Sequence, residues 1–138
     1  MLQLLAKISL LLLALCFHGT KADTIYSWSC GHGFSVQGSD GYCRLYQPDY
    51  KSTGVFKCPY SGCWSGDNNK WVTMTDCELI GSPNKGKSKQ KCAQYNWNVV
   101  KNNYDCTNSG GWTYACPNTP ETIHDYISCN DCTEVPKQ

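Results

Sequence analysis

From position 23 onward, the chain has few aliphatic side chains and no long apolar run. No stretch there approaches the roughly 20 apolar residues that a membrane-spanning helix needs, so we expect no membrane partner. A buried core must be built from other residues, and five Trp and nine Tyr offer most of the large apolar area. From position 23 onward, leucine and isoleucine occur only at Leu45, Leu79, Ile25, Ile80, Ile123 and Ile127.

An excess of one charge is also missing. The chain has 12 Lys+Arg against 11 Asp+Glu, and Arg44 is its single arginine. Removing Lys7 and Lys21 with the leader described below leaves 10 against 11, a formal net charge of −1. Bulk charge therefore gives no reason to expect nucleic acid or an anionic membrane as partner.

Helical periodicity is absent as well. Apolar and aromatic residues instead alternate over short runs, as in 24–30 and 71–75, which is typical of half-buried strands. Further strand-like runs cover 95–100 and 112–116, and Asn108-Ser109-Gly110-Gly111 predicts a hairpin turn. We predict an all-β fold.

Residues 1–22 have the features of a signal peptide. Lys7 supplies a positive charge, an apolar run follows over 10–17, and Thr20 and Ala22 are small residues before Asp23. We expect a secreted, soluble, monomeric product. Cys16 would leave with the leader, so ten of the 11 cysteines remain.

The polar segment 81–91 divides these ten cysteines equally. It has four lysines and little to bury, which predicts a linker between modules at 23–80 and 92–138. Spacings on the two sides are similar, because Cys30 and Cys43 lie 13 residues apart and Cys92 and Cys106 lie 14 apart. We expect two small, similar cysteine-rich β modules that arose by duplication.

Two cysteine chemistries are open on the residues alone. Ten cysteines in an exported chain favour five disulfides, and with five per module at least one must cross or stay unpaired. Cys63 with Cys132 is the crossing we expect first. Zinc is the alternative, and its ligands would be Cys30, Cys43, Cys58, Cys63, Cys77, Cys92, Cys106, Cys116, Cys129 and Cys132 with His32 and His124.

An aromatic residue precedes a cysteine by two positions four times, at Trp28, Phe56, Tyr104 and Tyr114. Residues i and i+2 of a strand share a face, so each ring is expected to shield a cross-link or metal.

Signatures of catalysis are thin, and we expect no enzyme. A ribonuclease-like site could in principle combine a histidine with acidic residues and Arg44. The other candidates are Glu78, Glu121, Asp125 and Glu134.

The leader, the cysteine content and the recurrent [YFW]-x-C motif resemble cysteine-rich secreted effectors of rust fungi. The segments 71–77, 91–97 and 104–109 carry the resemblance most closely. The layout is similar to that of a two-domain, zinc-binding avirulence effector of stem rust that a wheat resistance receptor recognises.

This resemblance implies a β-rich, zinc-binding virulence protein whose cysteines are ligands. It would bind a host plant protein, including an intracellular immune receptor after translocation into the host cytoplasm. The other expectations that the residues leave open are an apoplastic disulfide-rich toxin, inhibitor or glycan-binding protein, and a small secreted hydrolase.

Overall fold

The structure is a computed structural model that describes residues 28–46, 53–66, 68–82, 85–119 and 125–136, and every structural statement below concerns these residues. Within them, eleven strands, a single 3-10 turn, η1 (Tyr60–Gly62), and no α-helix are present, so the all-β prediction is confirmed. The strands are β1 (Trp28–Ser29), β2 (Gly33–Gln37), β3 (Asp40–Tyr46), β4 (Thr53–Pro59), β5 (Cys63–Trp64), β6 (Val72–Leu79), β7 (Ser88–Asn98), β8 (Asn103–Asn108), β9 (Thr113–Pro117), β10 (Ser128–Cys129) and β11 (Thr133–Glu134).

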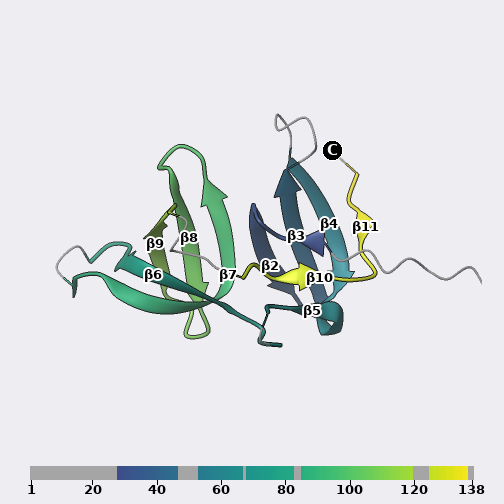
Figure 1. The fold of residues 1–138 in the computed structure, drawn as a ribbon, viewed down its shortest axis with the longest axis horizontal. Helices are drawn as coiled ribbons and strands as arrows, with labels where there is room; N and C mark the ends of the chain where they lie inside the picture. The colour runs from purple at the N-terminus through teal and green to yellow at the C-terminus, as the bar shows by residue number, and fades with distance from the viewer. Residues whose placement is uncertain (1–27, 47–52, 67, 83–84, 120–124, 137–138) are drawn as a thin grey trace, which may run out of the picture.

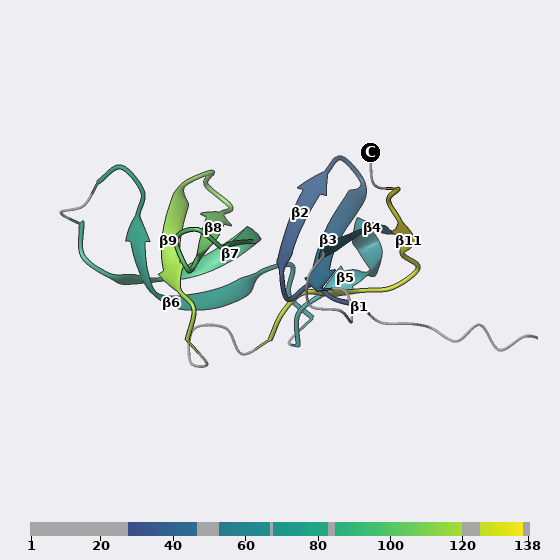
Figure 2. The same ribbon diagram turned by 90° about the horizontal axis from the view of Figure 1, so that it is seen from above.

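The strands form two lobes that lie side by side (Figures 1 and 2). The barrel lobe consists of β6, β7, β8 and β9. The two-sheet lobe consists of the sheet β11-β4-β3-β2 and the small sheet β1-β10-β5. Residues from both ends of the described chain therefore build the two-sheet lobe.

The barrel lobe is a closed ring of antiparallel strands. β7 pairs with β6 and β8, and β9 pairs with both β8 and β6. Closure leaves no free edge among these strands. Alternation along β6 turns Val72 and Met74 into the interior, while Thr73 between them is exposed. The predicted strand at 71–75 is confirmed apart from Trp71, which precedes β6.

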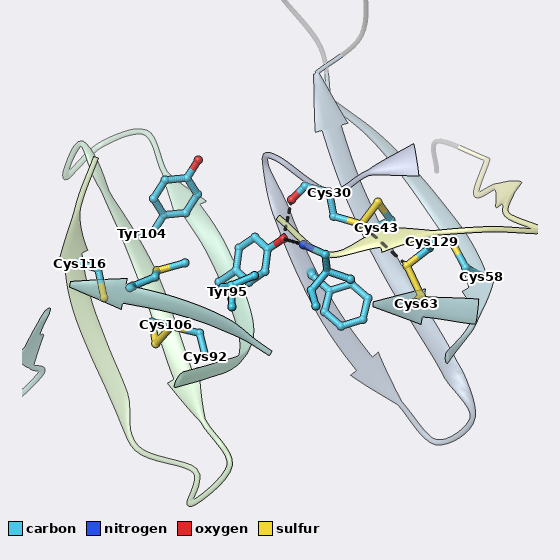
Figure 3. Close-up of a cluster of buried hydrophobic side chains, with 14 of the residues drawn as sticks. Cys30, Cys43, Cys58, Cys63, Cys92, Tyr95, Tyr104, Cys106, Cys116 and Cys129 are labelled. Carbon is cyan, nitrogen blue, oxygen red and sulfur yellow. Dashed lines mark hydrogen bonds between the residues drawn. A yellow bond between two sulfur atoms is a disulfide. The ribbon is translucent and has the colours of Figure 1, made fainter. Parts of the chain in front are cut away.

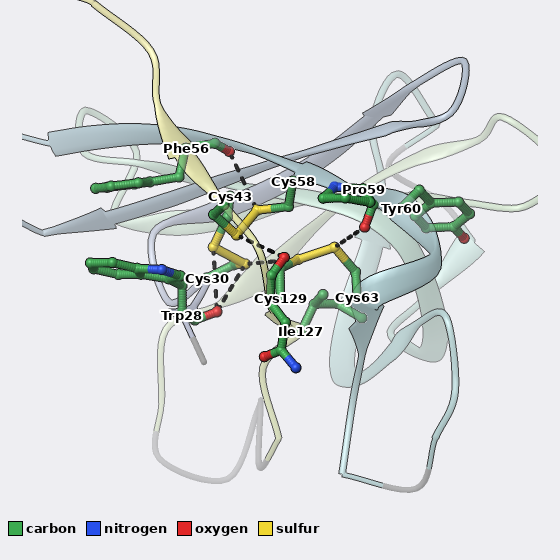
Figure 4. The surroundings of a disulfide bond; sticks show 12 residues. Trp28, Cys30, Cys43, Phe56, Cys58, Pro59, Tyr60, Cys63, Ile127 and Cys129 are labelled. Atoms are coloured by element: carbon green, nitrogen blue, oxygen red, sulfur yellow. Dashed lines mark hydrogen bonds between the residues drawn. A yellow bond between two sulfur atoms is a disulfide. The ribbon is translucent and has the colours of Figure 1, made fainter. Parts of the chain in front are cut away.

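The two-sheet lobe encloses a cluster of sulfur atoms (Figure 4). Cys30 Sγ lies 3.9 Å from Cys129 Sγ, which belongs to a neighbouring disulfide. The rings of Trp28 and Phe56 stack beside these cross-links with centroids 4.5 Å apart. At these two positions, the aromatic residue of the [YFW]-x-C motif covers disulfides as expected.

The lobes meet where β2 pairs with β7, with Gly33 opposite Asn96 and Phe34 opposite Tyr95. Next to these two residue pairs, the backbone N–H of Trp97 donates to the carbonyl of His32 at 2.8 Å. The junction is therefore a continuous sheet, and it makes the lobes one structural unit.

The segment 81–91, which we expected to be a linker, connects two strands of the barrel. Ser88 to Lys91 belong to β7, and Ser88 lies opposite Cys77 of β6. Backbone hydrogen bonds from Ser82 to Leu79 and from Lys85 to Ser82 shape the connection. Strand pairing replaces the burial that this polar sequence cannot provide, so residues 88–91 form a strand, and the division of the chain into two modules stays a prediction.

Two other local predictions have different outcomes. The turn at 108–111 is confirmed, since it joins β8 to β9. The strand expected over 95–100 ends at Asn98, and Val99 and Val100 lie in the β7–β8 turn. The Asn98 side chain accepts a hydrogen bond from the N–H of Lys101, and Asn102 has a positive φ of 50°, so turn geometry outweighs the β propensity of the two valines.

Candidate functional site

All ten cysteines of the described chain are paired in disulfides. Nine of them are buried, and Cys132 is half-buried. The five disulfides are Cys30–Cys43, Cys58–Cys132, Cys63–Cys129, Cys77–Cys116 and Cys92–Cys106.

The expected crossing from Cys63 to Cys132 is wrong in its partners. Cys63 of β5 lies opposite Cys129 of β10, with Cα atoms 4.0 Å apart, and the two bond directly. Cys132 instead reaches Cys58 of β4, the strand with which β11 pairs. With Cys77–Cys116, three disulfides join the two modules expected from the sequence.

The equivalence expected between the halves holds for one pair of bonds. Cys30–Cys43 and Cys92–Cys106 each tie the start of a strand meander to its second strand. The remaining six cysteines bond across the two modules, because β6 joins the barrel lobe and β10 joins the two-sheet lobe. The similarity of two modules remains a prediction.

Sulfur atoms gather in three groups, and within each group they lie within 4.8 Å of one another. The groups are Cys30 with Cys43 and Cys129, Cys58 with Cys63 and Cys129, and Cys92 with Cys106 and Cys116. Zinc binds thiolates. Because each of these sulfurs is in a disulfide, the oxidised chain does not fit the expected zinc sites.

His32 belongs to none of the sulfur groups in the described chain. His32 lies between β1 and β2, where burial, followed by the nearby positive charge of Arg44, lowers its pKa. His124 lies outside the described residues, and so does Glu121.

The remaining residues considered for a hydrolase lie on separate elements. Arg44 is on β3, Glu78 on β6 and Glu134 on β11, which are not neighbours in the sheet. Asp125 is an exposed residue before β10.

Exposed apolar side chains are concentrated around the barrel lobe. The five large exposed hydrophobic residues of the described chain all lie in connections that flank β6, β7, β8 or β9. Val100 is 91% exposed, Val99 76%, Trp112 62% and Ile80 47%. Trp71 is the fifth. Exposed apolar side chains in connecting segments are available for contact with a partner.

One end of the barrel opens into a hollow of about 360 Å³, which we call the barrel mouth. Leu79 and Tyr114 lie opposite each other on β6 and β9, two residues from Cys77 and Cys116 respectively. They therefore share the sheet face of that disulfide. The barrel mouth is lined by Leu79, Lys85, Gly86, Ser88, Trp112 and Tyr114.

Asn108 fixes the loop that carries Trp112. Its side-chain oxygen accepts hydrogen bonds from the N–H groups of Gly110 and Trp112, each at 3.0 Å. Its own N–H donates to the carbonyl of Trp112, and Gly111 takes a positive φ of 81° to close the turn. Trp112 is thus held in place although its side chain is mostly exposed.

A second hollow, of about 380 Å³, lies where the lobes meet. Its polar lining includes Arg44, Gln94, Asn96 and Asp105. The Arg44 guanidinium donates to Ser35 Oγ at 3.3 Å, and Asp105 accepts from Asn98 at 3.1 Å. This hollow offers one cation and one carboxylate.

The barrel mouth is absent from the sequence predictions, because those predictions place the aromatic residues in the buried core. Two signals could have found it. Trp112 follows Gly110 and Gly111 directly, a position in a turn where a large ring is hard to bury, and 81–91 gathers four lysines. Register supplies the missing part, since only the pairing of β6 with β9 places Leu79 beside Tyr114.

In the part of the chain that the structure describes, no helix has the length and apolarity needed to cross a membrane. Comparison of the chain with protein-family models, with curated proteins and with solved structures gives no match in any of the three.

Proposed function

We propose that this chain is a secreted effector of a plant-pathogenic fungus that acts by binding a host protein and not by catalysis. The observation that carries the proposal is that, among the described residues, the five large exposed hydrophobic side chains all lie in connections that flank strands of the barrel lobe. Loops held by a rigid scaffold are common recognition surfaces. The fungal origin rests on the [YFW]-x-C resemblance, and export rests on the leader at 1–22.

Disulfides make the scaffold suitable for this role. Cys77–Cys116 and Cys92–Cys106 cross-link the four strands of the barrel lobe from inside. A surface that is already ordered loses less conformational entropy on binding than a flexible one does. Recognition by a host immune receptor, inside the host cell, is part of this proposal.

The test is quantitative binding of a host protein by the full chain. A protein captured from host leaf extract is purified and its affinity measured for the wild type, for Val99→Ser/Val100→Ser and for Trp112→Ala. We expect at least one of the two barrel variants to weaken binding about tenfold or more. Gln37→Ala, at the exposed end of β2, is the matched control and should bind as the wild type does. Unchanged affinity in both barrel variants would contradict the proposal.

Glycan binding is a second candidate function, favoured by the exposure of Trp112 beside Tyr114. Sugar rings stack on such aromatic faces. A glycan array probed with the wild type and Trp112→Ala tests it, and this candidate fails if no glycan is bound in a Trp112-dependent manner.

Zinc remains a proposal for the reduced chain alone. In a reducing cytosol the three sulfur groups would supply thiolates, which zinc prefers. We expect reduced chain, refolded with zinc and freed of excess metal, to retain zinc in stoichiometric amount and to show dispersed amide signals. Reduced chain that stays unfolded and metal-free would exclude it.

A further inference from the structure

We propose that the barrel mouth and the lysines beside it bind a partner segment that is both acidic and apolar. The inference rests on the proposed function and deepens it by naming the chemistry of the protein partner. It combines a partly apolar hollow, a row of cations and a rim whose backbone is held by hydrogen bonds.

The hollow accepts an apolar side chain. Leu79, Trp112 and Tyr114 line it, and Trp112 is 62% exposed. Aromatic residues provide large contact areas at low cost in side-chain entropy, which is why Trp and Tyr dominate binding hot spots. An aliphatic or aromatic side chain inserted here would cover Trp112 and displace water from the mouth.

One of the cations lines this hollow, and the other three continue along the chain into β7. Lys85 lines the mouth, and Lys87, Lys89 and Lys91 follow at alternate positions. Alternate residues of a strand project from the same face, so Lys89 and Lys91 point the same way from β7. All four are exposed, and Lys91 Nζ lies 5.1 Å from the ring centroid of Trp71. The row therefore runs from one exposed tryptophan to another.

These lysines have no carboxylate partner within the described residues, where Lys57–Asp40 is the single ion pair. Asp76 and Glu78 of β6 are exposed on the neighbouring strand but make no ion pair with them. Four cations within seven residues attract carboxylates, and the attraction weakens as salt rises.

A protein segment fits this surface better than a uniform polyanion does. A nucleic acid or a polysaccharide could stack a ring on Trp112, but a polyanion draws its affinity from many anionic contacts, and this surface offers one row of four lysines. The nearly balanced charge of the chain, 12 Lys+Arg against 11 Asp+Glu, also provides no broad positive field. Charge and apolarity must therefore come from the same partner segment.

The test uses selection from a display library of random linear peptides on the oxidised full chain. We expect the enriched peptides to combine Asp or Glu with Leu, Phe or Trp. A synthetic peptide from the selection should lose at least tenfold in affinity for Trp112→Ala and for Lys85→Glu/Lys87→Glu, and its binding should weaken with salt. Lys101→Glu, an exposed lysine in the β7–β8 turn, is the control and should leave affinity unchanged.

Several results would overturn the inference. These are the absence of enrichment, enriched peptides without acidic residues, affinity that survives either mouth variant, and heparin or RNA bound more tightly than any selected peptide. Intact disulfides and an unchanged near-ultraviolet circular dichroism spectrum show that each variant folds, and the lysine variant keeps Trp112 in place.

Failure of this inference differs from failure of the proposed function. If a host protein binds through Val99 and Val100 and ignores the mouth variants, the function stands and the inference fails. If acidic peptides bind at the mouth but no host protein does, the surface is right and the effector function is wrong.

Discussion

The side chain of Tyr95 in β7 donates a hydrogen bond from its hydroxyl to the carbonyl oxygen of Cys30, 3.0 Å away across the junction of the two lobes (Figure 3). The same hydroxyl accepts the N–H of Ile127 at 3.1 Å. Tyr95 is 2% exposed. One buried side chain from the barrel lobe therefore satisfies two backbone groups that flank β1 and β10.

Removing this hydroxyl should destabilise the whole chain. In Tyr95→Phe, the Ile127 N–H loses its partner in a buried site and the Cys30 carbonyl keeps only the N–H of Gly33, so we expect the free energy of unfolding to fall by about 1–3 kcal/mol. Denaturant unfolding with the disulfides intact measures this. Tyr114→Phe is the control, because no hydrogen bond of its hydroxyl is present in the described chain. Equal effects of the two substitutions would contradict the assigned role.

Alkaline pH should act through the same residue. Burial raises the pKa of Tyr95 in the folded chain. The unfolded tyrosine ionises near pH 10, so this contribution to stability is complete below about pH 10 and decreases above it by about 1.4 kcal/mol per pH unit. Unfolding midpoints between pH 8 and 11 check the slope. Tyr95→Phe should show a shallower decline, and an identical decline in both proteins would refute this explanation.

The close approach of β2 to β7 requires glycine at position 33. A Cβ atom there would lie 2.8 Å from Asn96 Oδ1 and 3.0 Å from the carbonyl oxygen of Tyr95. We expect Gly33→Ala to cost about 1–3 kcal/mol by overpacking. Gly31→Ala is a matched control, since its nearest neighbour would be 4.0 Å away on the Tyr126 ring. The comparison is made by denaturant unfolding, and a Gly33 variant as stable as the Gly31 variant would rule out a tight junction.

Local features of this fold could be predicted from the sequence, and long-range pairings could not. The alternation at 71–75 and the turn at 108–111 depend on neighbouring residues, so both were recognised. β6 pairs with β7 and β9, but its alternation of buried and exposed residues would be the same whichever strands it joined. β6 comes from the first half of the chain and joins the barrel lobe, while β10 comes from the second half and joins the two-sheet lobe. Cysteine spacing therefore cannot predict this arrangement.

Long-range pairing and turn bonds also explain why the structure differs from the sequence predictions at 88–91 and at 99–100. Residues 88–91 are polar because they lie on an exposed part of β7, and backbone pairing with β6 orders them without burial. Val99 and Val100 are strong strand formers, yet the turn bonds of Asn98 leave both exposed. The disulfide partners follow from the strand pairings. Counting cysteines on each side of 81–91 therefore predicts that at least one disulfide joins the two halves, but it does not predict which cysteines form it.

The central claim is that disulfides between the two halves of the chain hold both lobes together as one scaffold, which carries the exposed hydrophobic residues around the barrel lobe. The most direct test is a free-thiol count and a peptide map of the disulfides in the full chain recovered from an oxidising secretory host. We predict no free thiol from Cys30 onward and five bonds, including Cys58–Cys132, Cys63–Cys129 and Cys77–Cys116. Free thiols at these positions, or bonds confined to the separate halves, would contradict it.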